Sequence, residues 1–262
     1  MLKNYRGRFP FKLATTSYIY PDEIVPNVAR LAPSFDEIEL VLFESKGPDS
    51  IPDDAQIDRL KELSHLRRVG FNVHLPIDIS LGDQKEAVRL RGVSVVKEVM
   101  ERTRPLHPSL YTLHLDSTEE GDVESWRKRI LLSLEGILPN GIEPQRISIE
   151  TLAYPFEWIG DLILEYGFSI CLDIGHILIQ GQDLDRYFEK YLSKTSIVHL
   201  HGFNSGRDHL GLDCLGEERI DSILLGLRNY TGIVSIEVFS IDDLESSLEV
   251  LEQRWERRTR RR

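Results

Sequence analysis

The chain has 262 residues, of which 41% are hydrophobic and 29% are charged, a composition with ample apolar material for a globular core. Its formal net charge of −11 argues against a nucleic acid or an anionic membrane as its partner. No apolar run approaches the roughly 20 residues that cross a bilayer, and no apolar stretch of a signal peptide follows the basic start of the chain. Two cysteines, Cys171 and Cys214, cannot make a disulfide framework, so we expect a cytoplasmic protein.

The C-terminal residues, about 254–262, depart from the acidic balance because most of them are arginine. Cations are favourable near the C-terminus of a helix, so we expect a solvated helix end that continues into a basic tail. A binding arm is the alternative interpretation.

Apolar, β-favouring segments alternate eight times with segments of helical period. The predicted strands are residues 13–19, 36–43, 68–77, 110–115, 146–152, 169–174, 196–203 and 233–239. The predicted helices are residues 22–31, 55–68, about 84–102, 123–138, 156–166, 183–192, 218–229 and 242–257. Eight such units predict one domain, residues 1–262, folded as a (β/α)8 TIM barrel with its functional side chains at the carboxyl ends of the strands.

An open, doubly wound α/β sheet is the alternative architecture. It would carry a glycine-rich phosphate turn after the first strand, and residues 15–18 (Thr-Thr-Ser-Tyr) contain no glycine. The chain also lacks an internal repeat and a linker long enough to divide it. The barrel is therefore preferred.

The segment 169–176, Ser-Ile-Cys-Leu-Asp-Ile-Gly-His, is the most informative stretch of the chain. It has the apolar character of a buried strand, and it ends in Asp173 and, three residues later, His176. Because successive side chains of a strand point to opposite faces, Ile170 and Leu172 face the helices while Asp173 faces the barrel interior. A carboxylate and an imidazole at the mouth of a barrel suit a divalent metal.

The same alternation places carboxylates and imidazoles at the inward ends of other strands. Strands three to eight bring to one mouth His74, His114, Glu150, Asp173 with His176, His199 and Glu237. Interior carboxylates cost free energy unless they are paired or bind a metal. Neutral imidazole together with carboxylate suits Zn²⁺, Mn²⁺ or Fe²⁺ better than Mg²⁺ or Ca²⁺. We therefore predict a metal centre, with a purely structural polar network as the alternative.

These residues resemble a known superfamily. Glu150 on strand five, Asp173-x-x-His176 after strand six, His199 on strand seven and Glu237 on strand eight are similar to the pattern of the xylose-isomerase-like TIM barrels. That superfamily includes sugar isomerases and epimerases and the endonuclease IV group. In the sugar epimerases, a Glu-Asp-His-Glu set of this kind surrounds one metal.

The resemblance to endonuclease IV extends to three further histidines, which in that group complete a three-metal site for phosphodiester cleavage. The candidates here are His74, His114 and His209. The chain departs from the group after strand seven, where an Asp-x-His pair is replaced by adjacent Asp208 and His209. The resemblance implies that a third metal would be held by His176 with Asp208 or His209.

Other stretches resemble the cobamide-remodelling phosphodiesterases, a family similar in fold to endonuclease IV. The stretches are residues 15–21 (Thr-Thr-Ser-Tyr-Ile-Tyr-Pro), 27–33 (Asn-Val-Ala-Arg-Leu-Ala-Pro), 39–45 (Glu-Leu-Val-Leu-Phe-Glu-Ser), 199–202 (His-Leu-His-Gly) and 208–210 (Asp-His-Leu). The resemblance implies hydrolysis of the phosphoester in the nucleotide loop of a B12-type corrinoid, so that its lower base can be replaced. The expected partner is this small-molecule substrate.

The residue types, considered without the resemblance, also fit phosphodiester hydrolysis. Two or three divalent ions, zinc or manganese, would clamp the attacking and leaving oxygens. We expect Glu150 to bridge two metals, one completed by His74 and His114 and the other by Asp173 and His199. Glu237 would hold metal and deprotonate the water.

Residues near the same mouth are candidates for substrate binding. They are His201, Arg207, Lys46, Glu44 and Asp208. Lys46 and Arg207 suit a phosphate, although single loop cations are often only solvated.

Three other functions stay open. An abasic-site endonuclease would share the site but would need a basic face for DNA. A single-metal sugar isomerase or epimerase would use Glu150 and Glu237 as its acid–base pair and leave His74 and His114 without a role. A catalytically silent metal-binding barrel is the non-enzyme alternative.

Overall fold

Eight parallel strands form a closed barrel in the computed structural model, which describes residues 2–46, 51–116, 122–138 and 141–259. The strands are β1 (Lys12–Thr16), β2 (Glu37–Val41), β3 (Gly70–His74), β4 (Tyr111–Leu113), β5 (Ile147–Glu150), β6 (Ser169–Asp173), β7 (Thr195–Leu200) and β10 (Ile233–Ile236). They follow one another around the barrel in chain order, and β10 closes it against β1. The predicted single TIM barrel is confirmed.

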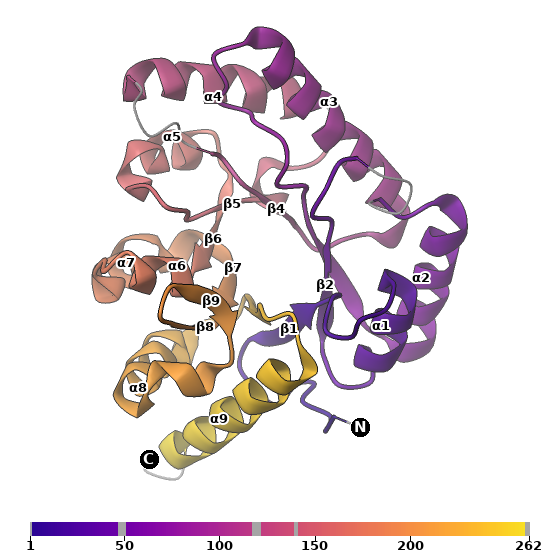
Figure 1. Ribbon diagram of the computed structural model, residues 1–262, viewed down its shortest axis with the longest axis vertical. Coiled ribbons are helices and arrows are strands. Elements are labelled where there is room, and N and C mark those ends of the chain that lie inside the picture. The colour runs from indigo at the N-terminus through magenta and orange to yellow at the C-terminus, as the bar shows by residue number, and fades with distance from the viewer. Residues whose placement is uncertain (1, 47–50, 117–121, 139–140, 260–262) are drawn as a thin grey trace.

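The helices surround the ring of strands (Figure 1). They are α1 (Ile24–Leu31), α2 (Asp54–Arg67), α3 (Glu86–Thr103), α4 (Val123–Ile137), α5 (Gly160–Glu165), α6 (Ile174–Ile179), α7 (Leu184–Tyr191), α8 (Glu217–Gly226) and α9 (Ile241–Thr259). Several begin at an aspartate whose side chain accepts a hydrogen bond from a backbone N–H of the first turn, as Asp53 does for α2 and Asp183 for α7. The main apolar core lies between this helical layer and the outward faces of the strands.

The barrel interior is divided into an apolar and a polar part. Ala14, Leu110, Cys171, Ile197 and Ile233 form a small buried cluster of their own. Asp173 lies two residues after Cys171 on β6, and His199 lies two residues after Ile197 on β7. Asp173 and His199 are partners in the parallel pairing of these two strands. Strand register therefore sets the two side chains next to each other at the carboxyl end of the barrel.

The prediction of one continuous strand over residues 196–203 is wrong. β7 ends at Leu200, and the chain then forms a separate antiparallel hairpin of β8 (Gly202–Asn204) and β9 (Arg207–Leu210). Ser205 and Gly206 both have positive φ (50° and 79°), as a tight two-residue turn between twisted strands requires. Arg207, expected in a loop, therefore belongs to a strand.

Two helices also differ from expectation. Only the helix at 183–192 was predicted after strand six, but α6 begins directly after β6 and precedes it. The helix predicted over 156–166 is interrupted at Ile159, which separates a short 3-10 helix (Phe156–Trp158) from α5.

The C-terminal segment continues α9 to Thr259. The Arg254 guanidinium pairs there with Asp221 and Glu217 of α8. Residues 260–262 of the expected basic tail lie outside the described residues.

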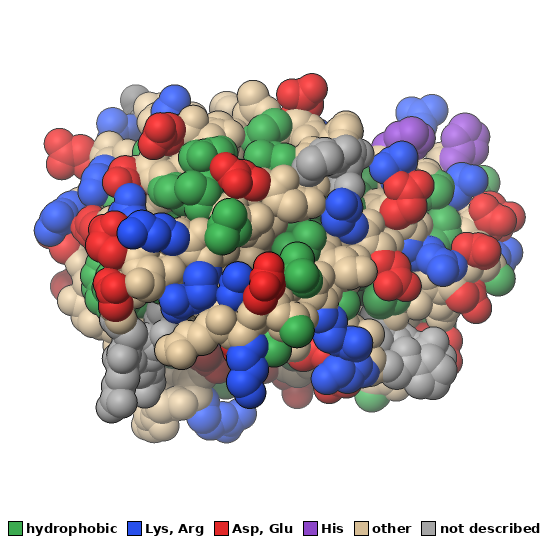
Figure 2. Space-filling model, turned by 90° about the horizontal axis from the view of Figure 1, so that it is seen from above, with side chains coloured by type: hydrophobic (Ala, Val, Ile, Leu, Met, Phe, Trp, Pro, Cys, Tyr) green, Lys and Arg blue, Asp and Glu red, His purple; other side chains and the backbone are tan. Residues whose placement is uncertain are grey.

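The charged side chains are mixed in sign on the face drawn in Figure 2, where Lys and Arg alternate with Asp and Glu. Among the described helices, none combines the length and the apolar character needed to span a bilayer. The cytoplasmic location stays a prediction.

Candidate metal centre

Asp173 and His176 owe their spacing to the start of a helix. Asp173 ends β6 and is the N-cap of α6, where its Oδ1 accepts a hydrogen bond from the His176 backbone N–H at 2.6 Å. An N-cap carboxylate and the residue three positions on face the same side of the first turn. The Asp-x-x-His motif is therefore a local structure that presents a carboxylate and an imidazole together.

The first group of candidate ligands consists of His74 on β3, His114 directly after β4 and Glu150 on β5. Glu150 Oε2 lies 3.2 Å from His74 Nε2 and 2.9 Å from His114 Nε2. The two imidazole rings stand nearly perpendicular, with centroids 4.8 Å apart. The ligand atoms of this group all lie within 4.8 Å of one another.

The second group consists of Glu150, Asp173, His199 and Glu237 and shares Glu150 with the first. His199 Nδ1 lies 3.3 Å from Glu150 Oε1, 3.1 Å from Glu237 Oε2 and 4.0 Å from Asp173 Oδ2. All four side chains are buried. Glu150 thus presents one oxygen to each group, as a bridging ligand would.

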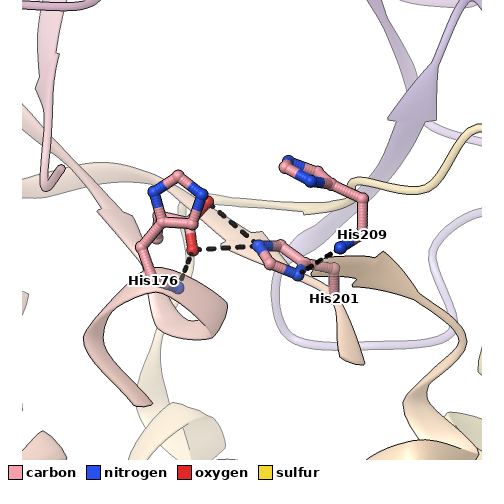
Figure 3. Close-up of side chains that lie close together, drawn as sticks. His176, His201 and His209 are labelled. Atoms are coloured by element: carbon pink, nitrogen blue, oxygen red, sulfur yellow. Dashed lines mark hydrogen bonds and ion pairs between the residues drawn. The ribbon is translucent and has the colours of Figure 1, made fainter. Parts of the chain in front are cut away.

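The third group consists of Asp173, His176, His201 and His209 (Figure 3). His201 Nε2 lies 3.1 Å from Asp173 Oδ1, and the His209 backbone N–H donates to His201 Nδ1 at 3.1 Å. The imidazoles of His201 and His209 are stacked, with ring centroids 4.3 Å apart. Asp208 extends the group, because its carboxylate lies 3.8 Å from His176 Nε2 and 3.2 Å from His209 Nδ1.

The donor set fits divalent cations better than hydrogen bonding alone. His114 Nε2 and Glu237 Oε2 are buried without a hydrogen bond of acceptable geometry, although His114 Nε2 lies 2.9 Å from Glu150 Oε2 and Glu237 Oε2 lies 3.1 Å from His199 Nδ1. One N–H at His199 Nδ1 cannot satisfy the three carboxylates that converge on it. Buried polar atoms of this kind are normally satisfied, so a cation would supply what the side chains lack.

Burial and charge act in opposite directions on the carboxylates. Burial raises the pKa of Glu150, but the charges of His114 and His199 outweigh it and hold that pKa well below its usual value. Burial raises the pKa of Glu237 in the same way, and His199 and His209 lower it well below its usual value. Both groups are therefore ionised and ready to bind a cation at neutral pH.

The imidazoles respond in the opposite sense. Burial lowers the pKa of His209, but the Glu237 carboxylate, whose Oε2 lies 3.6 Å from His209 Nε2, outweighs it and raises that pKa to about 9. Burial likewise lowers the pKa of His74, and Glu150 raises it above its usual value. In the metal-free chain these protons balance the buried carboxylates, and a bound cation would replace them.

The structure brings together all eight side chains proposed as metal ligands, namely His74, His114, Glu150, Asp173, His176, His199, His209 and Glu237. Of the proposed substrate contacts, His201 and Asp208 lie in the third group. Arg207 and Glu44 are exposed, in β9 and after β2, and Lys46 is exposed further along the same loop. These roles stay predictions.

Sequence reasoning missed the contact of Glu39 with this centre. Glu39 Oε1 lies 3.0 Å from His199 Nε2, on the far side of the ring from Glu150 and Glu237. The available signal was the alternation of β2, in which Glu37 and Glu39 occupy inward positions of a buried strand.

A sequence model of the xylose isomerase-like TIM barrel family matches residues 28–254, and the chain belongs to this family. Among its relatives is the probable endonuclease 4 of Carboxydothermus hydrogenoformans, which is 23% identical over 186 residues. That alignment covers 64% of this chain and 65% of the relative, so the chain spans less than two thirds of that protein's length.

Solved structures with this fold include a D-tagatose 3-epimerase-like protein, with a TM-score of 0.78, 22% identity and coverage of 94% of this chain and 97% of that one. Endonuclease IV from Thermus thermophilus has a TM-score of 0.71, 16% identity and coverage of 94% and 99%. The IOLI protein with a bound zinc atom has a TM-score of 0.70, 16% identity and coverage of 93% and 96%. At these identities the similarity establishes the fold, and the chemistry must be argued from the site.

Proposed function

We propose that the protein is a metal-dependent phosphodiesterase that hydrolyses the nucleotide-loop phosphoester of cobamides. The observation that supports the proposal most directly is that the first and second ligand groups share Glu150. His74 and His114 complete the first group, and an enzyme with one metal in the second group would not need them. Two adjacent cation sites of this kind suit the attacking and leaving oxygens of a phosphoester.

When bound, two or three divalent ions, zinc or manganese, would lower the pKa of a water molecule and neutralise the charge of the phosphoester. Glu150 would hold the two sites at a fixed separation. Glu237, whose Oε2 has no hydrogen-bond partner, would accept the proton of the attacking water. The water oxygen would form the new P–O bond while the ester bond breaks, and the leaving oxygen would take up a proton, from Glu237 or from solvent, to become the alcohol. Arg207 and Lys46 are the proposed phosphate contacts.

An aromatic row beside the metal ligands supports a substrate with a large apolar part. Tyr18, Phe43, Phe239 and His209 follow one another with ring-centroid distances of 5.1, 5.4 and 5.2 Å. Tyr18 also lines a pocket of about 480 Å³ between the loops after β1 and β2. The apolar side chains of this pocket include Pro21, Ile24, Leu42 and Pro52. A corrinoid with its aromatic lower base offers matching flat, apolar surfaces.

The test is to incubate the zinc- or manganese-loaded protein with a cobamide and to identify the products by mass. We expect cleavage of the nucleotide loop into a phosphomonoester and an alcohol. Glu150→Gln should abolish cleavage, whereas Glu37→Gln, which changes a buried carboxylate hydrogen-bonded to Ser109 and Lys12, should retain it. A metal-loaded protein that leaves cobamides intact would overturn the assignment.

A sugar epimerase is the second candidate, because Glu150 and Glu237 approach His199 Nδ1 from two directions and could act as an acid–base pair around one metal. Interconversion of ketose epimers by protein that binds one ion per chain would favour it. Cleavage of abasic DNA would instead indicate a nuclease.

A further inference from the structure

Glu39 is a buried carboxylate inside the barrel that no ligand group includes. It lies on β2, and neither it nor His199 has measurable solvent exposure. Its Oε1 lies 3.0 Å from His199 Nε2, and its Oε2 accepts a hydrogen bond from Ser235 Oγ at 2.6 Å. Ser235 thus fixes the carboxylate, and the carboxylate meets one edge of the imidazole.

The two nitrogens of His199 face different surroundings. Nδ1 faces the candidate metal ligands Glu150 and Glu237 at 3.3 and 3.1 Å, while Nε2 faces only Glu39 among the carboxylates within 4 Å in the described part of the chain. A neutral imidazole has one N–H and one lone pair, and an ionised carboxylate can only accept. With Nε2–H donated to Glu39, the Nδ1 lone pair points at the metal centre.

We propose that Glu39 is a positioning residue that selects the Nε2–H tautomer of His199 and holds its ring so that Nδ1 binds the metal. A carboxylate behind a ligating histidine also makes the ligand more basic. This inference rests on the proposed metal centre but not on the identity of the substrate.

Glu37 provides a matched control two residues earlier on the same strand. It is also inward and buried, and its Oε2 also accepts from a serine, Ser109 Oγ at 2.6 Å. Its other oxygen, however, pairs with Lys12 Nζ at 2.8 Å and meets no candidate metal ligand. Loss of a buried charge as such should therefore affect Glu37→Gln and Glu39→Gln alike, but only Glu39→Gln should affect the metal.

The experiment compares Zn²⁺ affinity of the wild type, Glu39→Gln and Glu37→Gln by competition with a chromophoric chelator. We expect Glu39→Gln to bind at least one ion about 10- to 100-fold more weakly, and Glu37→Gln to bind as the wild type does. Equal affinity of Glu39→Gln and wild type would overturn the proposal, as would equal weakening in both variants.

A second measurement needs neither glutamate variant. Long-range ¹H–¹⁵N spectra of the zinc-loaded wild type, with His199 assigned by difference from His199→Gln, report which ring nitrogen carries the proton. We expect a protonated Nε2 and a metal-bound Nδ1, and the reverse pattern overturns the proposal. If the wild type binds no zinc, the proposed metal centre is wrong. If it binds zinc but does not hydrolyse cobamides, only the proposed reaction is wrong.

Discussion

Gly175 packs so closely against His201 that a Cβ atom on it would overlap the imidazole ring. The contact lies in the first turn of α6, between Asp173, which caps the helix, and His176. His201 in turn contacts Asp173 Oδ1 at 3.1 Å. The absence of a side chain at position 175 therefore allows His201 to reach the carboxylate of Asp173, a candidate metal ligand.

Gly175→Ala should consequently displace either His201 or the first turn of α6. We expect a loss of activity on the order of 100-fold, because small misplacements of site residues are costly. The overpacking should also cost about 1–3 kcal/mol of stability. Gly136→Ala in α4 is the control, since its Cβ would overlap no ring and would come no closer than 3.2 Å to the nearest atom, Val93 Cγ1. Unchanged kcat/KM in Gly175→Ala would contradict the positioning role of this contact.

Glu150→Gln should empty or scramble the metal centre, because one amide cannot give each of two ligand groups an anionic oxygen. We expect loss of at least one bound ion per chain and of hydrolysis, measured by elemental analysis and by product formation. Near-normal activity with normal metal content would rule out a bridging role for Glu150.

Replacing His74 and His114 together with alanine should lower the metal content by about one ion while the barrel stays folded, because the first group would keep only Glu150 of its three ligands. Elemental analysis with circular dichroism measures both outcomes. His65→Ala is the control, since His65 is exposed on α2. If the metal content does not change, His74 and His114 contact the substrate or stabilise the fold and do not bind metal.

The metal-free protein should lose stability as the pH rises from about 6.5 to about 9. His209 has a pKa raised from 6.5 to about 9 in the folded chain, so folding favours its protonated form. This contribution is fully present below the unfolded pKa and disappears as the pH rises through the folded pKa. Denaturant unfolding of chelator-treated protein across this range measures the effect.

His209→Asn should flatten that pH dependence. Asparagine tolerates the positive φ of 53° at this position and does not titrate. A pH dependence as steep as in the wild type would assign the effect to other groups. Metal affinity should change in the opposite sense and increase with pH, because bound ions compete with these protons.

Phe239→Leu should raise KM for the cobamide more than it lowers kcat, because Phe239 lies in the aromatic row and is not a candidate metal ligand. An increase of about 2- to 13-fold corresponds to the roughly 0.5–1.5 kcal/mol of an aromatic contact. Phe9→Leu is the control, since Phe9 packs with Phe11 and Trp255. An unchanged KM would remove the aromatic row from the substrate site.

Local sequence patterns predict most of the barrel strands and most of the candidate metal ligands. Glu150, Asp173, His199 and Glu237 were found from strand alternation, because burial of one strand face constrains side chains two residues apart. The Asn204-Ser205-Gly206 turn could also have revealed the β8–β9 hairpin, but the β-favouring residues before it resembled a continuation of β7.

Contacts between distant segments could be decided only by the tertiary structure. Glu39 and His199 are 160 residues apart in the sequence and meet inside the barrel. The alternation of side chains within β2 or within β7 cannot predict that contact. The placement of His209 against His201 (Figure 3) likewise depends on the contacts of the β8–β9 hairpin with α6. The sequence by itself determined which side chains face the barrel interior, because that follows from the two-residue repeat of each strand. Barrel closure decided which of them meet, because it sets the distances between strands that are far apart in the chain.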